Sequence, residues 1–289
     1  MSRLQFIKPT ARKGGLLSGY TGDPSGIWSL RQRYELLTFP PLDYHPGAAA
    51  AYSLRSLSSS YTGPVVTVRR SSDDAEADFT ASEVAGGALA TWVGAGNDGF
   101  VTTWYDQSGN GYNLTQATAA SQPTFSAGAV NGLPAITFSA GDLIDTAAAV
   151  VNGATLRTIF AVCSGGTSAT NRIANLGDAS GSGTQYAITG ELAVRVGNGS
   201  RVFGASLSAT HALVTVAATT GDVSGTELRV NGSAESVTST SARTLNTQDG
   251  LSVGESLGGD VAELVIYDSD LSAPVRNDVE ANLMSSYAL

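Results

Sequence analysis

The sequence predicts an all-β protein built as a two-sheet antiparallel sandwich. Glycine is abundant, at 34 of 289 residues, and only 14% of the residues are charged, a composition typical of short strands joined by many turns. From residue 133 onward, short apolar stretches alternate with polar turns at the spacing that a sandwich requires. A chain of this length holds one large β domain and a short extension.

The first 46 residues are predicted to form an extended N-terminal arm. They hold six basic and three acidic residues, whereas the remainder holds ten basic and twenty-two acidic residues. Phe6 and Ile7 lie in an imperfect alternation that would add a strand to a neighbour's sheet edge. Glycines and prolines recur through the rest of the arm, and its apolar residues do not repeat at helical spacing. Prolines at 40, 41 and 46 mark a linker, so we expect two units, residues 1–46 and 47–289.

The next stretch predicts short helices and a buried strand. Residues 48–57 are rich in alanine and leucine with apolar spacing near 3.6, which indicates a short helix. After this helix we expect a strand at 65–68, a charged loop at 69–74 and a second short helix over 80–90. Residues 101–105 are β-branched or aromatic, which predicts a strand with Trp104 in the core. The polar residues 106–111 then supply a tight turn.

The second half of the chain carries the sandwich pattern to its end. Asn231-Gly232 is a hairpin signal, and residues 273–287 carry apolar positions at helical spacing, which predicts a short C-terminal helix. The strands are expected at residues 133–138, 155–163, 172–176, 185–189, 192–196, 212–218, 226–230, 250–253 and 261–267.

Several separated motifs carry a resemblance to a known family. These are the stretch at residues 51–79, WYDQSGNGYNLTQA at 104–117, LPAITF at 133–138 and DVAELVIYDSDLS at 260–272. They resemble the laminin G-like, concanavalin A-like jelly-roll family, in the branch that includes the catalytic domain of fungal α-L-arabinofuranosidase B. The resemblance implies a jelly-roll sandwich over residues 47–289.

The same resemblance indicates how catalysis would have to work. Glycoside cleavage normally requires two facing carboxyl groups. The resemblance places the nucleophilic glutamate of that branch at Ser180, and a serine there cannot replace a carboxylate. The second carboxylate falls near Glu255 or at Asp260, and Asp178 lies close to Ser180. We therefore expect no enzyme activity and no catalytic residue, with a glycoside hydrolase of α-L-arabinofuranosidase type as the alternative.

Two kinds of binding residue are expected near the central turn. Aromatic rings that stack on sugars, with amides that read hydroxyl groups, indicate a carbohydrate-binding set: Trp92, Tyr112, Asn113 and Tyr186. Oxygen ligands at loop spacing make calcium a candidate at Asp106, Asn110 and Asn113, although the same side chains serve equally well as turn caps. No other cofactor is expected.

Charge, the position of the single cysteine and the spacing of the histidines argue against other classes of function. An acidic main domain disfavours nucleic acid and anionic membranes as partners. Cys163 lies in an apolar strand and is expected to fill the core. His45 and His211 lack the spacing of metal ligands.

The expected function rests on the arm. Residues 25–40, SGIWSLRQRYELLTFP, resemble a short motif of phage structural proteins, and no secretory signal is visible. We expect an accessory structural protein of a tailed-phage virion, made in the host cytoplasm and present in several copies on head or tail. Its partners would be capsid or tail subunits and cell-surface glycans. A cellular carbohydrate-binding module is a further alternative. The docking residues would be Phe6, Ile7, Ile27, Trp28, Leu30 and Tyr34.

Overall fold

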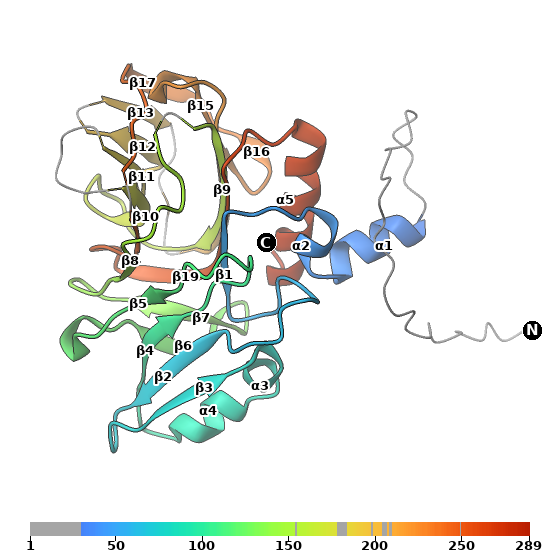
Figure 1. Ribbon diagram of the computed structural model, residues 1–289, viewed down its shortest axis with the longest axis vertical. Helices are drawn as coiled ribbons and strands as arrows, with labels where there is room; N and C mark the ends of the chain where they lie inside the picture. The colour runs from blue at the N-terminus through green and yellow to red at the C-terminus, as the bar shows by residue number, and fades with distance from the viewer. Residues whose placement is uncertain are drawn as a thin grey trace, which may run out of the picture.

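The computed structural model describes residues 30–153, 155–177, 184–197, 199–203, 207, 210–248 and 250–289, with side chains from residue 34 onward. These residues form antiparallel β structure with few helices (Figure 1). The helices are α1 (Leu30–Thr38), α2 (Pro41–Tyr44), α3 (Ala81–Ala85), α4 (Ala88–Val93) and α5 (Ala273–Tyr287), with short 3₁₀ turns at Ala119–Ser121 and Val223–Gly225. The strands are β1 (Ala50–Ser53), β2 (Val66–Arg70), β3 (Glu76–Phe79), β4 (Gly99–Trp104), β5 (Leu114–Thr115), β6 (Thr124–Val130), β7 (Leu133–Phe138), β8 (Ile144–Thr146), β9 (Arg157–Cys163), β10 (Arg172–Gly177), β11 (Gln185–Thr189), β12 (Ala193–Val196), β13 (Gly199–Phe203), β14 (Ala212–Ala218), β15 (Thr226–Val230), β16 (Ser233–Ala234), β17 (Val237–Ser241), β18 (Leu251–Val253) and β19 (Gly259–Tyr267).

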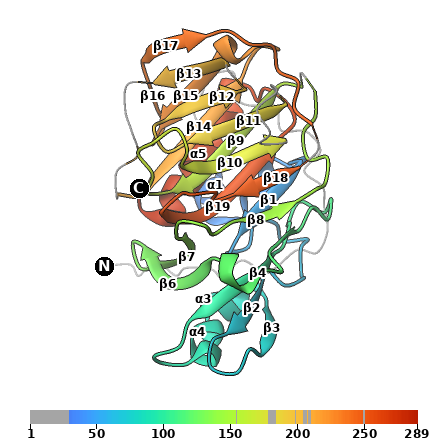
Figure 2. The same cartoon turned by 90° about the vertical axis from the view of Figure 1, so that its left-hand side faces the viewer.

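The strands make two layers, which confirms the predicted sandwich. The front sheet runs in the order β3-β2-β4-β5-β8-β18-β10-β11-β12-β13-β17. The back sheet runs β16-β15-β14-β9-β19-β1. Strands β6 and β7 connect the two, because β7 pairs with β19 and β6 pairs with β4. Figure 2 looks onto the front sheet, with α5 behind.

Alternation along the back-sheet strands builds two apolar layers. In β9, Ile159, Ala161 and Cys163 face the core between the sheets, whereas Phe160 and Val162 face the other way and pack beneath α5. Trp104 and Cys163 are fully buried, as predicted. Because successive side chains of a strand point to opposite faces, β9 is apolar throughout and is covered on both sides.

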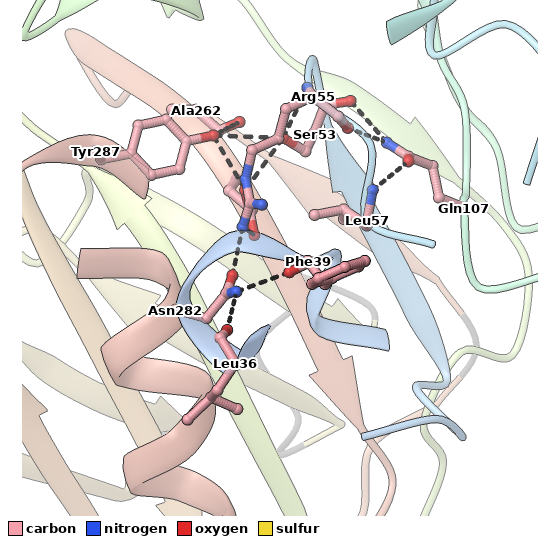
Figure 3. A network of polar contacts seen from close by, with 10 residues as sticks. Leu36, Phe39, Ser53, Arg55, Leu57, Gln107, Ala262, Asn282 and Tyr287 are labelled. Carbon is pink, nitrogen blue, oxygen red and sulfur yellow. Dashed lines mark hydrogen bonds and ion pairs between the residues drawn. The ribbon is translucent and has the colours of Figure 1, made fainter. Parts of the chain in front are cut away.

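A buried polar network fixes α5 to the sandwich (Figure 3). Glu263 of β19 is completely buried and accepts two hydrogen bonds from the Arg55 guanidinium, at 2.7 and 2.9 Å, and one from the Tyr287 hydroxyl at 3.0 Å. Asn282 of α5 accepts a bond from Arg55 and donates to the backbone oxygens of Leu36 and Phe39. The network therefore links β1, β19 and α5 to the end of α1.

Some local predictions were wrong and others are confirmed. Residues 48–57 do not form a helix: Ala50–Ser53 is a buried strand paired with β19, because tertiary pairing overrides the weak helix preference of alanine. The helix expected over 80–90 is two short helices separated at Gly86-Gly87, where Gly87 has φ +76°. The C-terminal helix matches residues 273–287, and Asn231-Gly232 joins β15 to β16.

The predicted arm is partly described. Residues 30–38 form a helix, contrary to the prediction of a non-helical arm. Leu36 and Leu42 are buried, and Tyr34 is 67% exposed. Of the other expected docking residues, Leu30 begins α1, and Phe6, Ile7, Ile27 and Trp28 lie outside the described residues. The division at residue 46 stays a prediction.

Candidate active site

A row of polar side chains crosses the front sheet where β8, β18 and β10 lie side by side. Asp145 is paired with Ser252, and Ser252 is paired with Asn175. The residues on either side of them in the strands, such as Ile144 and Leu176, face the core. The row therefore lies on the outer face of the sheet, the face turned to the viewer in Figure 2.

A cavity of about 340 Å³ lies over this row. Its size falls in the range of small-molecule sites. It is lined by Leu143, Asp145, Thr146, Asn175, Gly177, Gly250, Leu251, Ser252 and Glu255.

Bare backbone forms one wall of the cavity. The Gly177 amide donates to the Gly250 carbonyl at 2.9 Å, so the ends of β10 and β18 touch. Gly177 has φ +88°, and a Cβ there would lie 2.0 Å from the Thr184 carbonyl oxygen. Only glycine allows this close approach.

Glu255 is held at the rim by the turn that follows β18. Its carboxylate forms an ion pair with Arg172 at 2.6 Å, and its carbonyl accepts the Arg172 amide at 2.9 Å. The preceding Gly254 has φ +83°, and a Cβ there would lie 2.0 Å from the ring of Phe138. The turn is thus fixed by contacts to both β10 and β7.

Asp145 approaches the same cavity from β8 in a different environment. Among the described residues, no hydrogen bond or ion pair engages its carboxylate, and partial burial raises its pKa above the ordinary value. Asp145 is nevertheless an exposed residue, so water screens part of this effect.

Asn175 and Ser252 supply further hydrogen-bonding groups to the lining of this cavity. Asn175 is 1% exposed, and its Nδ2 donates to the Gly177 carbonyl at 3.2 Å. Its Oδ1 has no hydrogen-bond partner in the described part of the chain. A buried acceptor without a donor is costly in a folded protein.

The cavity therefore brings together two carboxyl groups of different environment and two polar groups suited to hydroxyls. Glycoside hydrolysis uses a pair of carboxyl groups whose environments differ. Of the two positions left open by the sequence, Glu255 lines the cavity and Asp260 does not. The Asp260 carboxylate instead accepts from Thr137 and Ser164 and contacts His211. Asp178 and Ser180 lie outside the described residues.

None of the residues predicted to bind sugar lines this cavity. Trp92 is half-buried and packs on Phe79, with ring centroids 5.4 Å apart. Tyr186 is fully buried beneath the Arg157 guanidinium, so its ring offers no surface to a ligand. Tyr112 and Asn113 lie in the turn after β4, and binding of a sugar by these two stays a prediction.

The residues predicted to bind calcium cap that same turn. The Asp106 carboxylate accepts four hydrogen bonds, from Ala51, Tyr112 and both the amide and hydroxyl of Ser108. Asn113 accepts from the Asp106 amide, and Asn110 donates to two backbone carbonyls. In the described ranges, no group of three or more His, Cys, Asp or Glu side chains is arranged to hold a metal ion. Calcium stays a prediction.

Sequence reasoning missed Asp145 and Asn175. A single asparagine among apolar residues in RIANLG was the available signal, because a polar residue at one alternating position marks the outer face of a strand.

None of the helices in the described ranges is long and apolar enough to span a membrane.

Comparisons with known proteins place this fold among sugar-cleaving enzymes. The family model described as "Alpha-L-arabinofuranosidase B, catalytic" matches residues 43–189, about half of the chain. α-L-Arabinofuranosidase B of Penicillium canescens is 39% identical over 93 residues, which are 29% of this chain and 20% of that protein. A probable α-L-arabinofuranosidase B of Aspergillus fumigatus is 44% identical over 75 residues, 25% of this chain and 15% of that protein. The matched stretches thus span a fifth or less of these relatives.

Solved structures agree on the fold. An arabinofuranosidase complexed with arabinofuranosyl-α-1,2-xylobiose superposes with a TM-score of 0.67 and 20% identity, over 86% of this chain and 65% of that one. A GH54 α-L-arabinofuranosidase soaked with a cyclic sulfate inhibitor gives 0.65 and 19%, over 86% and 66%. At this level of identity the likeness establishes the architecture.

Proposed function

Because this chain belongs to the α-L-arabinofuranosidase B catalytic-domain family, we propose that it hydrolyses α-L-arabinofuranosides in the cavity between Asp145 and Glu255. The observation that carries the proposal is the presence of two carboxyl groups in unlike environments on one sugar-sized cavity. Such a pair is what separates an acid from a base or nucleophile at one pH.

Family membership corrects several predictions made from the sequence. The assignment to the laminin G-like family and to a tailed-phage virion is wrong, as are the virion location and the capsid or tail partners. The expectation of no enzyme activity is also overturned by the enzymes that this chain matches. The error came from giving a short motif in residues 25–40 more weight than the motifs spread over the β domain.

The proposed mechanism gives each carboxyl a separate role. Asp145, whose pKa is raised by partial burial, acts as the general acid and protonates the glycosidic oxygen as its bond to the anomeric carbon breaks. Glu255, ion-paired with Arg172, supplies the second carboxylate at the anomeric carbon. Water then adds to the anomeric carbon in place of the leaving group, and the proton that this water loses replaces the one that Asp145 gave up. Free arabinose is released, and both carboxyls return to their starting states.

Asn175 and Ser252 orient the sugar in this scheme. The Oδ1 atom of Asn175 accepts a sugar hydroxyl, and the Ser252 side chain lies between it and Asp145 on the same face. Hydrogen bonds to hydroxyls fix the ring relative to the two carboxyls, which supplies the positioning part of catalysis.

The test compares carboxyl-to-amide variants on a neutral substrate, arabinofuranosyl-α-1,2-xylobiose. Asp145→Asn and Glu255→Gln are each expected to lower kcat about 10²–10⁴-fold, because each removes one proton-transfer or nucleophilic group. Asp142→Asn and Glu191→Gln are matched controls. Asp142 binds a backbone amide in the preceding turn, and Glu191 forms an ion pair with Arg195, yet neither lines the cavity.

Arabinose release measured by chromatography decides the outcome. If the wild-type protein binds the trisaccharide but releases no arabinose, the domain binds without hydrolysis and the proposed function is wrong. If it releases arabinose and both cavity variants match the controls, catalysis takes place elsewhere.

A further inference from the structure

A second cavity, of about 400 Å³, opens where the outer strands of the two sheets meet the start of α5. Figure 1 shows β13, β15 and β17 together at that end of the sandwich. It shares no lining residue with the active-site cavity. Its lining residues are Arg201, Phe203, Thr226, Glu227, Leu228, Arg229, Ala234, Glu235, Val237 and Arg276.

Three arginines from separate elements converge on this cavity. Arg276 of α5 forms an ion pair with Glu227 at 3.0 Å, and Arg229 of β15 forms one with Glu280 at 3.2 Å. In the described part of the chain, Arg201 of β13 forms no ion pair. The lining thus holds three positive and two negative side chains, so its formal net charge is positive; within the described ranges Glu235, like Arg201, forms no ion pair.

Two of these arginines also retain unused donors. The Nε atoms of Arg201 and Arg276 are buried and have no hydrogen-bond partner among the described residues. Buried donors of this kind are nearly always satisfied in folded proteins. A planar carboxylate is the acceptor that guanidinium donors match best.

The rest of the lining suits a ring rather than a bare ion. Phe203 and Leu228 form a buried apolar floor, and Val237 is 40% exposed at the edge. We propose that this cavity binds a hexuronate, with its carboxylate on Arg201 and Arg276 and its ring beside Val237. The choice of a sugar acid rests on the proposed function, since an acidic residue in a carbohydrate chain would give the domain a second contact to that chain.

The test follows the Nε–H resonances of the arginines in the full ¹⁵N-labelled chain during titration with trigalacturonate. The resonances of Arg201 and Arg276 are expected to shift, and Arg201→Gln is expected to weaken binding at least about tenfold, because one charge-assisted contact is lost. Arg201→Lys keeps the charge and tests whether the guanidinium is needed. Arg70→Gln, which breaks the ion pair between Arg70 at the end of β2 and Asp73 in the following turn, is the matched control.

Neutral galactotriose and inorganic sulfate are the comparison ligands. Equal binding of galactotriose, equal shifts with sulfate alone, or unchanged affinity in Arg201→Gln would each overturn the proposal. Glu255→Gln should bind trigalacturonate like the wild-type protein, and Arg201→Gln should cleave the neutral trisaccharide normally. A failure at either cavity can therefore be told from a failure at the other.

Discussion

The carboxyl groups of Asp145 and Glu255 lie in different environments, and this difference underlies the roles proposed for them. Asp145 has lost part of its water without gaining a partner in the described structure, so its pKa is raised above the ordinary value. Glu255 faces the Arg172 guanidinium at 2.6 Å. Of the two carboxyls on this cavity, the one at Glu255 therefore has a cation beside it and the one at Asp145 has none in the described ranges.

Activity should fall as pH rises through the pKa of Asp145. Because that pKa is raised, the acid stays protonated to a higher pH than an aspartate of ordinary pKa, and kcat declines only above it. Asp145→Asn should remove this decline together with most of the rate on arabinofuranosyl-xylobiose. With 4-nitrophenyl α-L-arabinofuranoside, whose leaving group needs little protonation, the variant should retain far more activity. An unchanged alkaline decline in Asp145→Asn would show that another group is the acid.

Gly254→Ala should damage both stability and activity. The new methyl group would lie 2.0 Å from the buried Phe138 ring and would force φ +83° on alanine, costing about 1–3 kcal/mol of unfolding free energy. Because Glu255 is the next residue, kcat should fall as well.

Gly258→Ala is the matched control for this glycine. Its φ is +61° and nothing lies within 4 Å of the added methyl group, so its loss of unfolding free energy comes from the backbone strain of a positive φ alone. The difference between the two variants in urea unfolding therefore measures the cost of the clash with Phe138. Equal losses in the two would mean that Phe138 does not hold the turn.

At the scale of elements, the Arg55 and Glu263 pair lies in the polar network that joins α5 to the back sheet. Arg55→Met should lower the unfolding free energy by about 3–5 kcal/mol, because it leaves a buried carboxylate without its cation. Arg70→Met, at a more exposed pair with Asp73, should lower the unfolding free energy far less, because water screens that pair. If both variants unfold at the same urea concentration, the network does not stabilise the fold.

The local sequence pattern predicted helices and strands correctly where tertiary contacts did not override the local preference. The C-terminal helix matches because its apolar positions at Val279 and Leu283 repeat at helical spacing and meet the back sheet. Strand β1 was missed because Ala50 and Ala51 have no strand preference of their own, and pairing with β19 decides their conformation.

At the scale of the whole molecule, the active-site cavity is a product of strand order. Asp145, Asn175 and Ser252 are tens of residues apart in sequence and become neighbours only because β18 lies between β8 and β10. Sequence reasoning predicted the sandwich from alternation and turns. It had no means of predicting which strands pair, and so it named Glu255 among candidates but not its companions.

The most direct measurement is a crystal structure of Glu255→Gln soaked with 4-nitrophenyl α-L-arabinofuranoside. We predict that the furanose ring lies in the cavity, with its anomeric carbon between residues 145 and 255 and a hydroxyl on Oδ1 of Asn175. A sugar bound at another surface, with this cavity holding only water, would contradict the central claim.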